Sequence, residues 1–158
     1  MCKFKVTELS MNLNCAMKCD ETETTVRFQE VDEWGIAWYG HYAGWFELGR
    51  MELLRKFDLL PRQFLEMGYI APVVSLKCEY KAPARTGDHI VIKTTVLKPD
   101  KAALTFSFEI YRKEDQKLLA RGETTQVLMT TGGVLLYCFP DDIRIKINHL
   151  LEVLHGKL

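Results

Sequence analysis

Long apolar runs are absent from this sequence, and their absence narrows the class of protein. No run reaches the roughly 18 apolar residues that a helix needs to cross a bilayer. Lys3, Lys5 and Glu8 interrupt the first 20 residues, which therefore lack the apolar stretch of a secretory signal. We expect no membrane insertion, and we predict an N-terminal leader over residues 1–21 followed by a single domain over residues 22–158.

Net charge is also missing, and cysteine is too scarce for a disulfide framework. Lys and Arg number 21, as do Asp and Glu, so the formal net charge is zero. This balance argues against nucleic-acid binding and removes a charge barrier to self-association. Five cysteines in a chain of this size predict reduced thiols and a cytoplasmic location. Cys15 and Cys19 are four residues apart, but no further ligands accompany them, so no metal site is expected.

The sequence does contain one long helical pattern followed by a series of strand patterns. Apolar residues recur every three or four positions over residues 42–57, which predicts a helix with Arg50 and Arg55 on its polar side. Gly44 and Gly49 weaken this helix intrinsically, and we interpret both as places where it lies close to a sheet. Residues 23–30, ahead of this helix, are predicted to form a strand. The elements predicted after the helix are a short helix at 61–68, strands at 73–80, 88–97, 103–113 and 117–131, a hairpin at 130–139 and a helix at 140–154.

Strands that follow one another through short turns are antiparallel. The order of elements therefore predicts an α+β protein in which a curved antiparallel sheet wraps around one long central helix.

The segment Val31–Tyr42 places a carboxylate just before the start of the long helix. Asp32 lies three residues before Gly35, and an aromatic run follows. A helix start carries unpaired backbone N–H groups and a partial positive charge, which stabilise developing negative charge. A carboxylate beside it can attack a carbonyl or take a proton from water. Spacing alone equally permits a turn or cap role for Asp32.

Two landmarks in the sequence resemble the hotdog-fold acyl-CoA thioesterases, in the branch that contains 4-hydroxybenzoyl-CoA thioesterase and the Tol-Pal-associated thioesterases. The first is Val26–Glu47, with its Asp-x-x-Gly motif and aromatic helix start, and the second is Tyr80–Asp88. The resemblance covers about residues 24–143. It implies a hotdog fold and hydrolysis of an acyl-CoA thioester, with coenzyme A as part of the substrate and no metal or redox cofactor. It also implies homodimers whose sheets join, often paired into homotetramers.

The resemblance further implies roles for individual residues. Asp32 would act as the nucleophile or as the general base for a water, and the backbone N–H of Tyr39 would stabilise the oxyanion. The residues expected to contact the substrate are Gly35, Trp38, His41, Tyr42, Lys98 and Lys101. Trp34 departs from the family pattern because it replaces a small residue. Only the two lysines stand where related enzymes carry a dense basic cluster for the CoA phosphates.

Other interpretations remain open at this stage. A non-catalytic hotdog module that binds acyl-CoA or acyl carrier protein would fit the bulky Trp34 and the few basic residues. A hotdog hydratase or dehydratase is disfavoured, because Tyr39 stands where such an enzyme would need a histidine. Glu47 fits an ion pair with Arg50 or a catalytic carboxylate, and His41 fits a helix-start residue or a general base.

Overall fold

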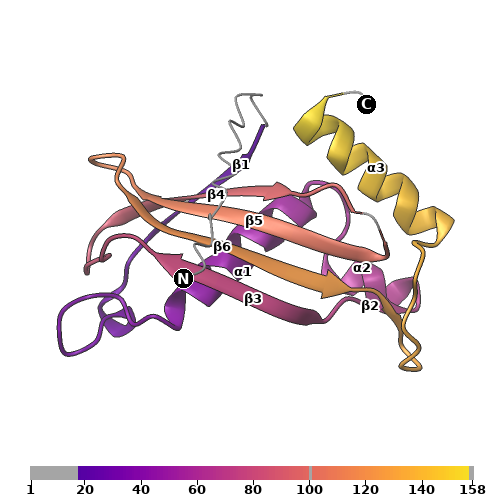
Figure 1. The fold of residues 1–158 in the computed structure, drawn as a ribbon, viewed down its shortest axis with the longest axis horizontal. Helices are drawn as coiled ribbons and strands as arrows, with labels where there is room; N and C mark the ends of the chain where they lie inside the picture. The colour runs from indigo at the N-terminus through magenta and orange to yellow at the C-terminus, as the bar shows by residue number, and fades with distance from the viewer. Residues whose placement is uncertain (1–17, 100, 157–158) are drawn as a thin grey trace, which may run out of the picture.

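The computed structural model describes residues 18–99 and 101–156, and its main feature is a five-stranded antiparallel sheet (Figure 1). The strand order is β1-β4-β5-β6-β3. The strands of this sheet are β1 (Asp20–Thr25), β3 (Val73–Tyr80), β4 (His89–Val96), β5 (Ala103–Arg112) and β6 (Leu118–Val127). A smaller sheet pairs β2 (Tyr69–Ile70) with β7 (Met129–Thr130). The helices are α1 (His41–Arg55), α2 (Pro61–Glu66) and α3 (Asp141–His155), and a short 3-10 helix, η1 (Phe28–Glu30), precedes α1.

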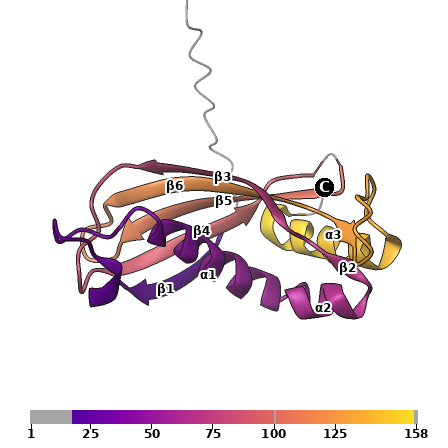
Figure 2. The ribbon, with the colours of Figure 1, turned by 90° about the horizontal axis from the view of Figure 1, so that it is seen from below.

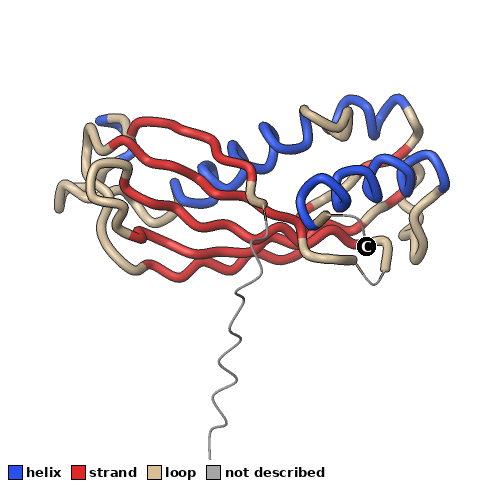
Figure 3. Tube along the Cα trace, turned by 90° about the horizontal axis from the view of Figure 1, so that it is seen from above, coloured by secondary structure: helices blue, strands red, loops and turns tan. Residues whose placement is uncertain are grey.

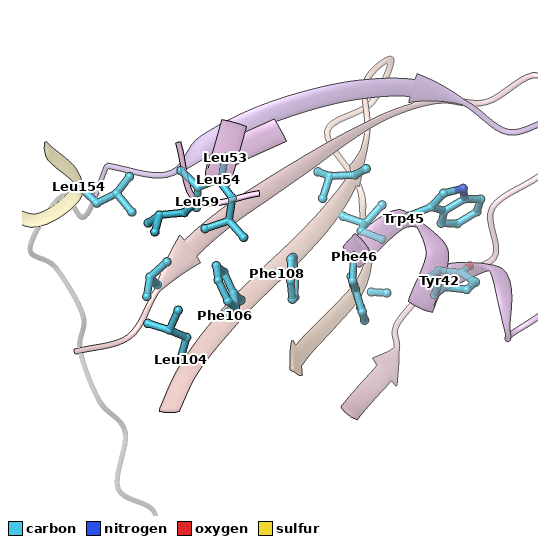
Figure 4. Packing of buried hydrophobic residues seen from close by; sticks show 14 of the residues in the cluster. Tyr42, Trp45, Phe46, Leu53, Leu54, Leu59, Leu104, Phe106, Phe108 and Leu154 are labelled. Atoms are coloured by element: carbon cyan, nitrogen blue, oxygen red, sulfur yellow. The ribbon is translucent and has the colours of Figure 1, made fainter. Parts of the chain in front are cut away.

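Helix α1 lies along one face of the sheet, and α2 and α3 lie toward one end (Figures 2 and 3). Every second residue of β5 is buried, as the period of two in a strand requires. The buried side chains meet the apolar face of α1, where the rings of Phe46 and Phe108 stack with their centroids 4.7 Å apart (Figure 4). The predicted α+β arrangement of a sheet against one long helix is therefore present.

The two glycines of α1 differ in what surrounds them. A Cβ atom added to Gly49 would lie 2.5 Å from Thr94 Oγ1 and 2.8 Å from Ile92 Cγ2, so glycine lets α1 approach β4 closely. This confirms the interpretation of Gly49. The same interpretation of Gly44 is wrong, because Gly44 is exposed and an added Cβ would meet nothing within 4 Å. Five positions along a helix of 3.6 residues per turn separate two residues by roughly 140°, so both cannot face the sheet.

The predicted strand at 23–30 is wrong at both ends, since β1 runs from Asp20 to Thr25. The chain leaves the strand because the Glu30 carboxylate accepts a hydrogen bond from the Arg27 N–H at 2.7 Å, which closes η1. Strand β1 begins inside the predicted leader, whose residues 1–17 lie outside the described residues.

The predicted hairpin at 130–139 is present, but its second strand is short. The Thr130 N–H donates to the Val134 carbonyl at 2.9 Å, and Leu135 pairs with Met129 in an isolated antiparallel bridge. The Leu136 N–H donates to the carbonyl of Leu128 at 2.9 Å, and the Tyr137 carbonyl accepts from the Ala102 N–H at 3.2 Å. The chain then leads into α3, which was predicted to within one residue at each end.

Strand β3 lies at one edge of the sheet, beside β6 and away from β4, the next strand in the sequence. The connection at 81–88 therefore crosses one end of the sheet. All but one of the residues of β3 are exposed, among them Val74 and Leu76. Within the described residues no strand pairs with the outer side of β3. A long exposed edge strand that carries apolar side chains favours pairing with another chain.

Within residues 18–99 and 101–156, no helix has the length and apolar character to cross a membrane. In the same ranges Cys19, Cys78 and Cys138 are free thiols, and Cys2 and Cys15 fall outside them. The described side chains form no group of three or more His, Cys, Asp or Glu placed to hold a metal ion. The cytoplasmic location and the lack of a cofactor stay predictions.

Candidate active site

Asp32 lies at the turn of a short hairpin formed by residues 30–38. The Asp32 N–H donates to the Ile36 carbonyl at 2.9 Å, and the Trp38 N–H donates to the Glu30 carbonyl at 2.8 Å. The Gly35 N–H donates to the Asp32 carbonyl at 2.9 Å, which closes the turn. Gly35 has a φ of 71°, which glycine adopts without strain. These bonds fix the path of the chain from Asp32 to the start of α1.

The second sequence landmark packs against this hairpin. The Ala37 N–H donates to the Ala84 carbonyl at 2.8 Å. The Tyr80 hydroxyl donates to the Tyr39 carbonyl at 3.1 Å, and its ring meets that of Tyr42 edge-on at a centroid distance of 5.0 Å. The crossing connection that follows β3 thus brings together two segments that lie far apart in the sequence.

The aromatic residues at the start of α1 pack over Gly40. A Cβ atom on Gly40 would lie 2.0 Å from the Trp38 ring, so a side chain there would displace the indole. The Trp38 ring contacts the rings of Tyr39 and His41, with centroid distances of 4.8 and 5.6 Å. Trp38 and Tyr39 are 45% and 65% exposed, so this aromatic group lies at the surface.

The backbone around Tyr39 is fixed, while its own N–H has no acceptor among the described residues. The Trp38 carbonyl accepts from the His41 N–H at 2.9 Å, and the Tyr39 carbonyl accepts from Tyr80. The peptide groups on both sides of Tyr39 are therefore held. The Tyr39 N–H donates to no acceptor within residues 18–99 and 101–156. A fixed, unpaired donor at a helix start is the geometry that oxyanion stabilisation requires.

The Asp32 carboxylate is half-buried and makes one hydrogen bond in the described part of the chain. Its Oδ1 accepts from the Trp34 N–H at 2.9 Å, so Asp32 is the turn residue that the simpler interpretation predicted. This bond occupies one oxygen and leaves Oδ2 available. A turn role and a chemical role are thus compatible in the same side chain.

Glu30 begins the hairpin that carries Asp32, and no role was predicted for it. Its side chain is 5% exposed and accepts hydrogen bonds from the Arg27 N–H at 2.7 Å and from the Arg27 guanidinium at 3.0 Å. Burial pushes the pKa of Glu30 upward, but the two hydrogen bonds and the positive charge of Arg27 outweigh burial and lower that pKa below its usual value. The sequence feature that could have indicated this ion pair is an Arg and a Glu three residues apart, just ahead of Asp32.

Tyr42 in the first turn of α1 and Tyr80, whose ring packs against it, keep their protons at neutral pH. Tyr42 is 3% exposed, and burial raises its pKa. Burial, followed by the hydrogen bond to Cys78, raises the pKa of Tyr80 to about 12. A protonated Tyr80 can donate to the Tyr39 carbonyl over the whole physiological range.

The structure does not gather every predicted contact residue in one place. Strand β4 begins at His89 beside Thr25 and ends at Val96, whose carbonyl lies 2.7 Å from a ring nitrogen of His155. Lys98 and Lys101 follow the end of β4, whereas the Asp32 hairpin packs against the connection that leads into its start, so within one protomer they lie at opposite ends of the sheet.

Glu47 and Arg50 form the ion pair within α1 that the helical spacing predicted. The exposure of Arg50 was predicted wrongly, since the residue is 6% exposed. It packs over the Phe106 ring, with Cζ 6.0 Å from the ring centroid.

Comparison with known proteins identifies the relatives of this chain. The family model described as the Thioesterase-like superfamily matches residues 26–147. The Synechocystis protein sll0410, assigned as an esterase, is 32% identical over 134 residues, which are 83% of this chain and 79% of that protein. The acyl-CoA thioester hydrolase YbgC of Escherichia coli is 26% identical over 121 residues, 77% of this chain and 81% of YbgC. The crystal structure of DHNA-CoA thioesterase from Staphylococcus aureus has a TM-score of 0.77 at 25% identity and covers 90% of this chain and 97% of that one. These similarities confirm the predicted hotdog fold.

Proposed function

Because this chain belongs to the thioesterase-like superfamily, we propose that it hydrolyses an acyl-CoA thioester to a free acid and coenzyme A. The observation that supports this best is the fixed Tyr39 N–H at the start of α1, which has no acceptor among the described residues and lies on the same segment as Asp32. The Asp-x-x-Gly motif is our reason for placing it in the branch of the 4-hydroxybenzoyl-CoA and Tol-Pal-associated thioesterases.

In the proposed reaction, the Tyr39 N–H donates to the thioester oxygen as negative charge develops there, which is worth roughly 3 kcal/mol. Asp32 Oδ2 acts in one of two ways. As a nucleophile it attacks the carbonyl carbon and releases the CoA thiolate, and water then cleaves the mixed anhydride. As a general base it takes a proton from a water that attacks directly. Both routes add one water across the C–S bond, and the Trp34 N–H orients the carboxylate in both.

The decisive variant is Asp32→Asn. An asparagine oxygen still accepts from the Trp34 N–H, so the turn is kept while the carboxylate is lost. We expect kcat/KM on a good acyl-CoA substrate to fall by at least about 10²-fold, with an unchanged melting temperature. Glu33→Gln removes the neighbouring exposed carboxylate and should keep full activity.

Full activity of Asp32→Asn would show that the mechanism is wrong. A different outcome separates catalysis from binding. If coenzyme A stabilises the wild-type protein against heat but no short, long or aromatic acyl-CoA is turned over, the protein is a binding module.

We also propose that the protein is a homodimer, alone or within a tetramer, formed through β3. The support is an exposed edge strand of 8 residues that carries the apolar side chains of Val73, Val74 and Leu76. Antiparallel pairing of two β3 strands about a two-fold axis would join two sheets into one. It would also place the Val73 end of one β3 beside the Tyr80 end of the other. The sheet end that carries Lys98 and Lys101 would then approach the Asp32 hairpin of the second copy.

Sedimentation velocity tests this interface. The double variant Val74→Lys/Leu76→Lys adds two positive charges to each β3 edge and should sediment as a monomer. Ile145→Lys places the same change on α3, where Ile145 is 68% exposed, and should leave the dimer intact. A wild-type protein that sediments as a monomer at assay concentrations would refute the proposal.

A further inference from the structure

A cavity of about 130 Å³ lies between the second half of α1, α2 and the sheet. Its walls are mainly apolar, and the residues that line it include Met51, Leu54, Leu59, Phe64 and Leu104. Three of these, Leu54, Leu59 and Leu104, lie at one end of the core, and Tyr42 and Trp45 lie at the other (Figure 4). An engineered cavity of roughly 150 Å³ holds a benzene molecule, so this one has room for a chain of about six carbons.

Two polar residues, Gln126 and Arg50, also line this cavity. The Gln126 side-chain amide donates to the Ala71 carbonyl and is therefore used within the fold. One terminal nitrogen of Arg50 pairs with Glu47, but its Nε is buried and has no hydrogen-bond partner in the described residues. Buried donors are usually satisfied, and a buried guanidinium usually has its partners beside it.

The ion pair with Glu47 does not explain why Arg50 is buried. Arg55 forms an equivalent pair with Glu52, also three residues away on α1, yet its side chain is 61% exposed. The Arg50 side chain is 7% exposed and its Glu47 partner is 51% exposed. An arginine on this helix can thus make such a pair in solvent. Its position at the cavity wall, with a free donor, instead fits an acceptor that enters the cavity.

In the dimer proposed above, strand β3 would link this cavity to the candidate active site of the other copy. Ala71 lines the cavity just before β3 begins, and Tyr80 at the end of β3 contacts the Tyr39 carbonyl. In the two-fold dimer proposed above, the start of one β3 lies beside the end of the other. The cavity of one protomer then lies on the side of the Asp32 hairpin of its partner.

We infer that the cavity receives the far end of the acyl group, and that Arg50 selects acyl groups whose far end carries a hydrogen-bond acceptor oxygen. This inference rests on the proposed thioesterase function and names its substrate class. A hydroxyl or a carboxylate oxygen would satisfy Arg50, and a methyl terminus would leave the donor unpaired. Sites built to hydrogen-bond a substrate group discriminate strongly against analogues that lack it.

The test compares CoA thioesters of equal length with a terminal methyl, hydroxyl or carboxylate group, over acyl chains of four to ten carbons. We expect an oxygen-bearing member to show a kcat/KM at least about tenfold above its methyl counterpart. Arg50→Met should lose this preference, and Arg55→Met, the exposed match on the same helix, should keep it. Arg50→Gln serves the same purpose if the Met variant does not fold. The hydroxyl and carboxylate arms show which acceptor is preferred.

A binding measurement separates this inference from the proposed function. Monomethyl esters of the dicarboxylic acids or methyl esters of the ω-hydroxy acids, again of four to ten carbons, should shift the Nε–H resonance of Arg50 in an NMR titration, and methyl hexanoate should not. If no thioester is hydrolysed, the proposed function fails and the titration still decides the role of Arg50. If thioesters are hydrolysed with equal efficiency with and without the oxygen at every length, or if neither kind of ester shifts the Arg50 signal, the inference is overturned.

Discussion

Replacing Gly49 by alanine tests how closely α1 is seated on the sheet. The new Cβ would lie 2.5 Å from Thr94 Oγ1 and 2.8 Å from Ile92 Cγ2. Both neighbours are fully buried, β-branched residues, so neither rotates freely to make room. Overpacking of this kind costs about 1–3 kcal/mol, whereas the higher helix propensity of alanine returns about 1 kcal/mol. We expect Gly49→Ala to lower the free energy of unfolding by about 0–2 kcal/mol.

Gly44→Ala is the matched control on the same helix. Its Cβ would meet nothing within 4 Å, so only the propensity gain remains, and the variant should be more stable by up to about 1 kcal/mol. The difference between the two variants isolates the overpacking term of about 1–3 kcal/mol. In a domain of this size, that difference corresponds to a gap of roughly 2–12 °C between their melting temperatures.

Urea unfolding followed by tryptophan fluorescence and by far-UV circular dichroism measures both free energies. Equal slopes for the two variants would show that the denatured states are comparable. If Gly49→Ala proves as stable as Gly44→Ala, α1 does not pack closely against Thr94 and Ile92 at Gly49, and the overpacking argument is refuted.

Three further changes probe the site itself. Gly40→Ala should displace the Trp38 indole and lower kcat/KM by about tenfold or more, with little change in melting temperature, because the Gly40 backbone is already helical. Tyr80→Phe removes the hydrogen bond to the Tyr39 carbonyl, so kcat should fall several-fold while stability changes by less than about 1.5 kcal/mol in urea unfolding. The folded pKa of Glu30 is lowered, so its stabilising contribution is present above the unfolded pKa of about 4.3 and is lost as pH falls through the folded value. Glu30→Gln should therefore be less stable than wild type at neutral pH, and stability measured against pH should decline less on the acid side.

The helices and most strands could be predicted because the patterns that specify them are local. The repeat of three and four residues in α1 and the alternation in β5 are readable from any short window of sequence. The place of β3 could not be predicted in this way. Its own residues do not say which strand it pairs with, and the register with β6 is decided by the whole sheet.

The same distinction between local and distant contacts applies to the site. Asp32 was proposed from its spacing ahead of the helix start and Tyr39 from the family resemblance, and both predictions depend on one short segment. The hydrogen bond from Tyr80 was not foreseen, since it joins residues that only the crossing connection brings together. Arg50 was placed on the polar side of α1 because a charged residue is usually exposed. Arg50 is buried where α1 packs over Phe106, a contact between distant segments that the helical pattern does not reveal.

Mixed dimers would show whether the carboxylate and the arginine of one site come from different chains. A dimer of one Asp32→Asn and one Arg50→Met protomer has two sites. If each site takes its carboxylate from one chain and its arginine from the other, one site carries both substitutions and the other carries neither. The unsubstituted site should hydrolyse oxygen-bearing thioesters with the preference of the wild type. If each site lay within one chain, the only protomer with Asp32 would lack Arg50, and the mixture would hydrolyse thioesters without preference. Mixing the two variants under exchange conditions and measuring both kcat/KM values therefore distinguishes the two arrangements, and activity without preference would refute the shared site.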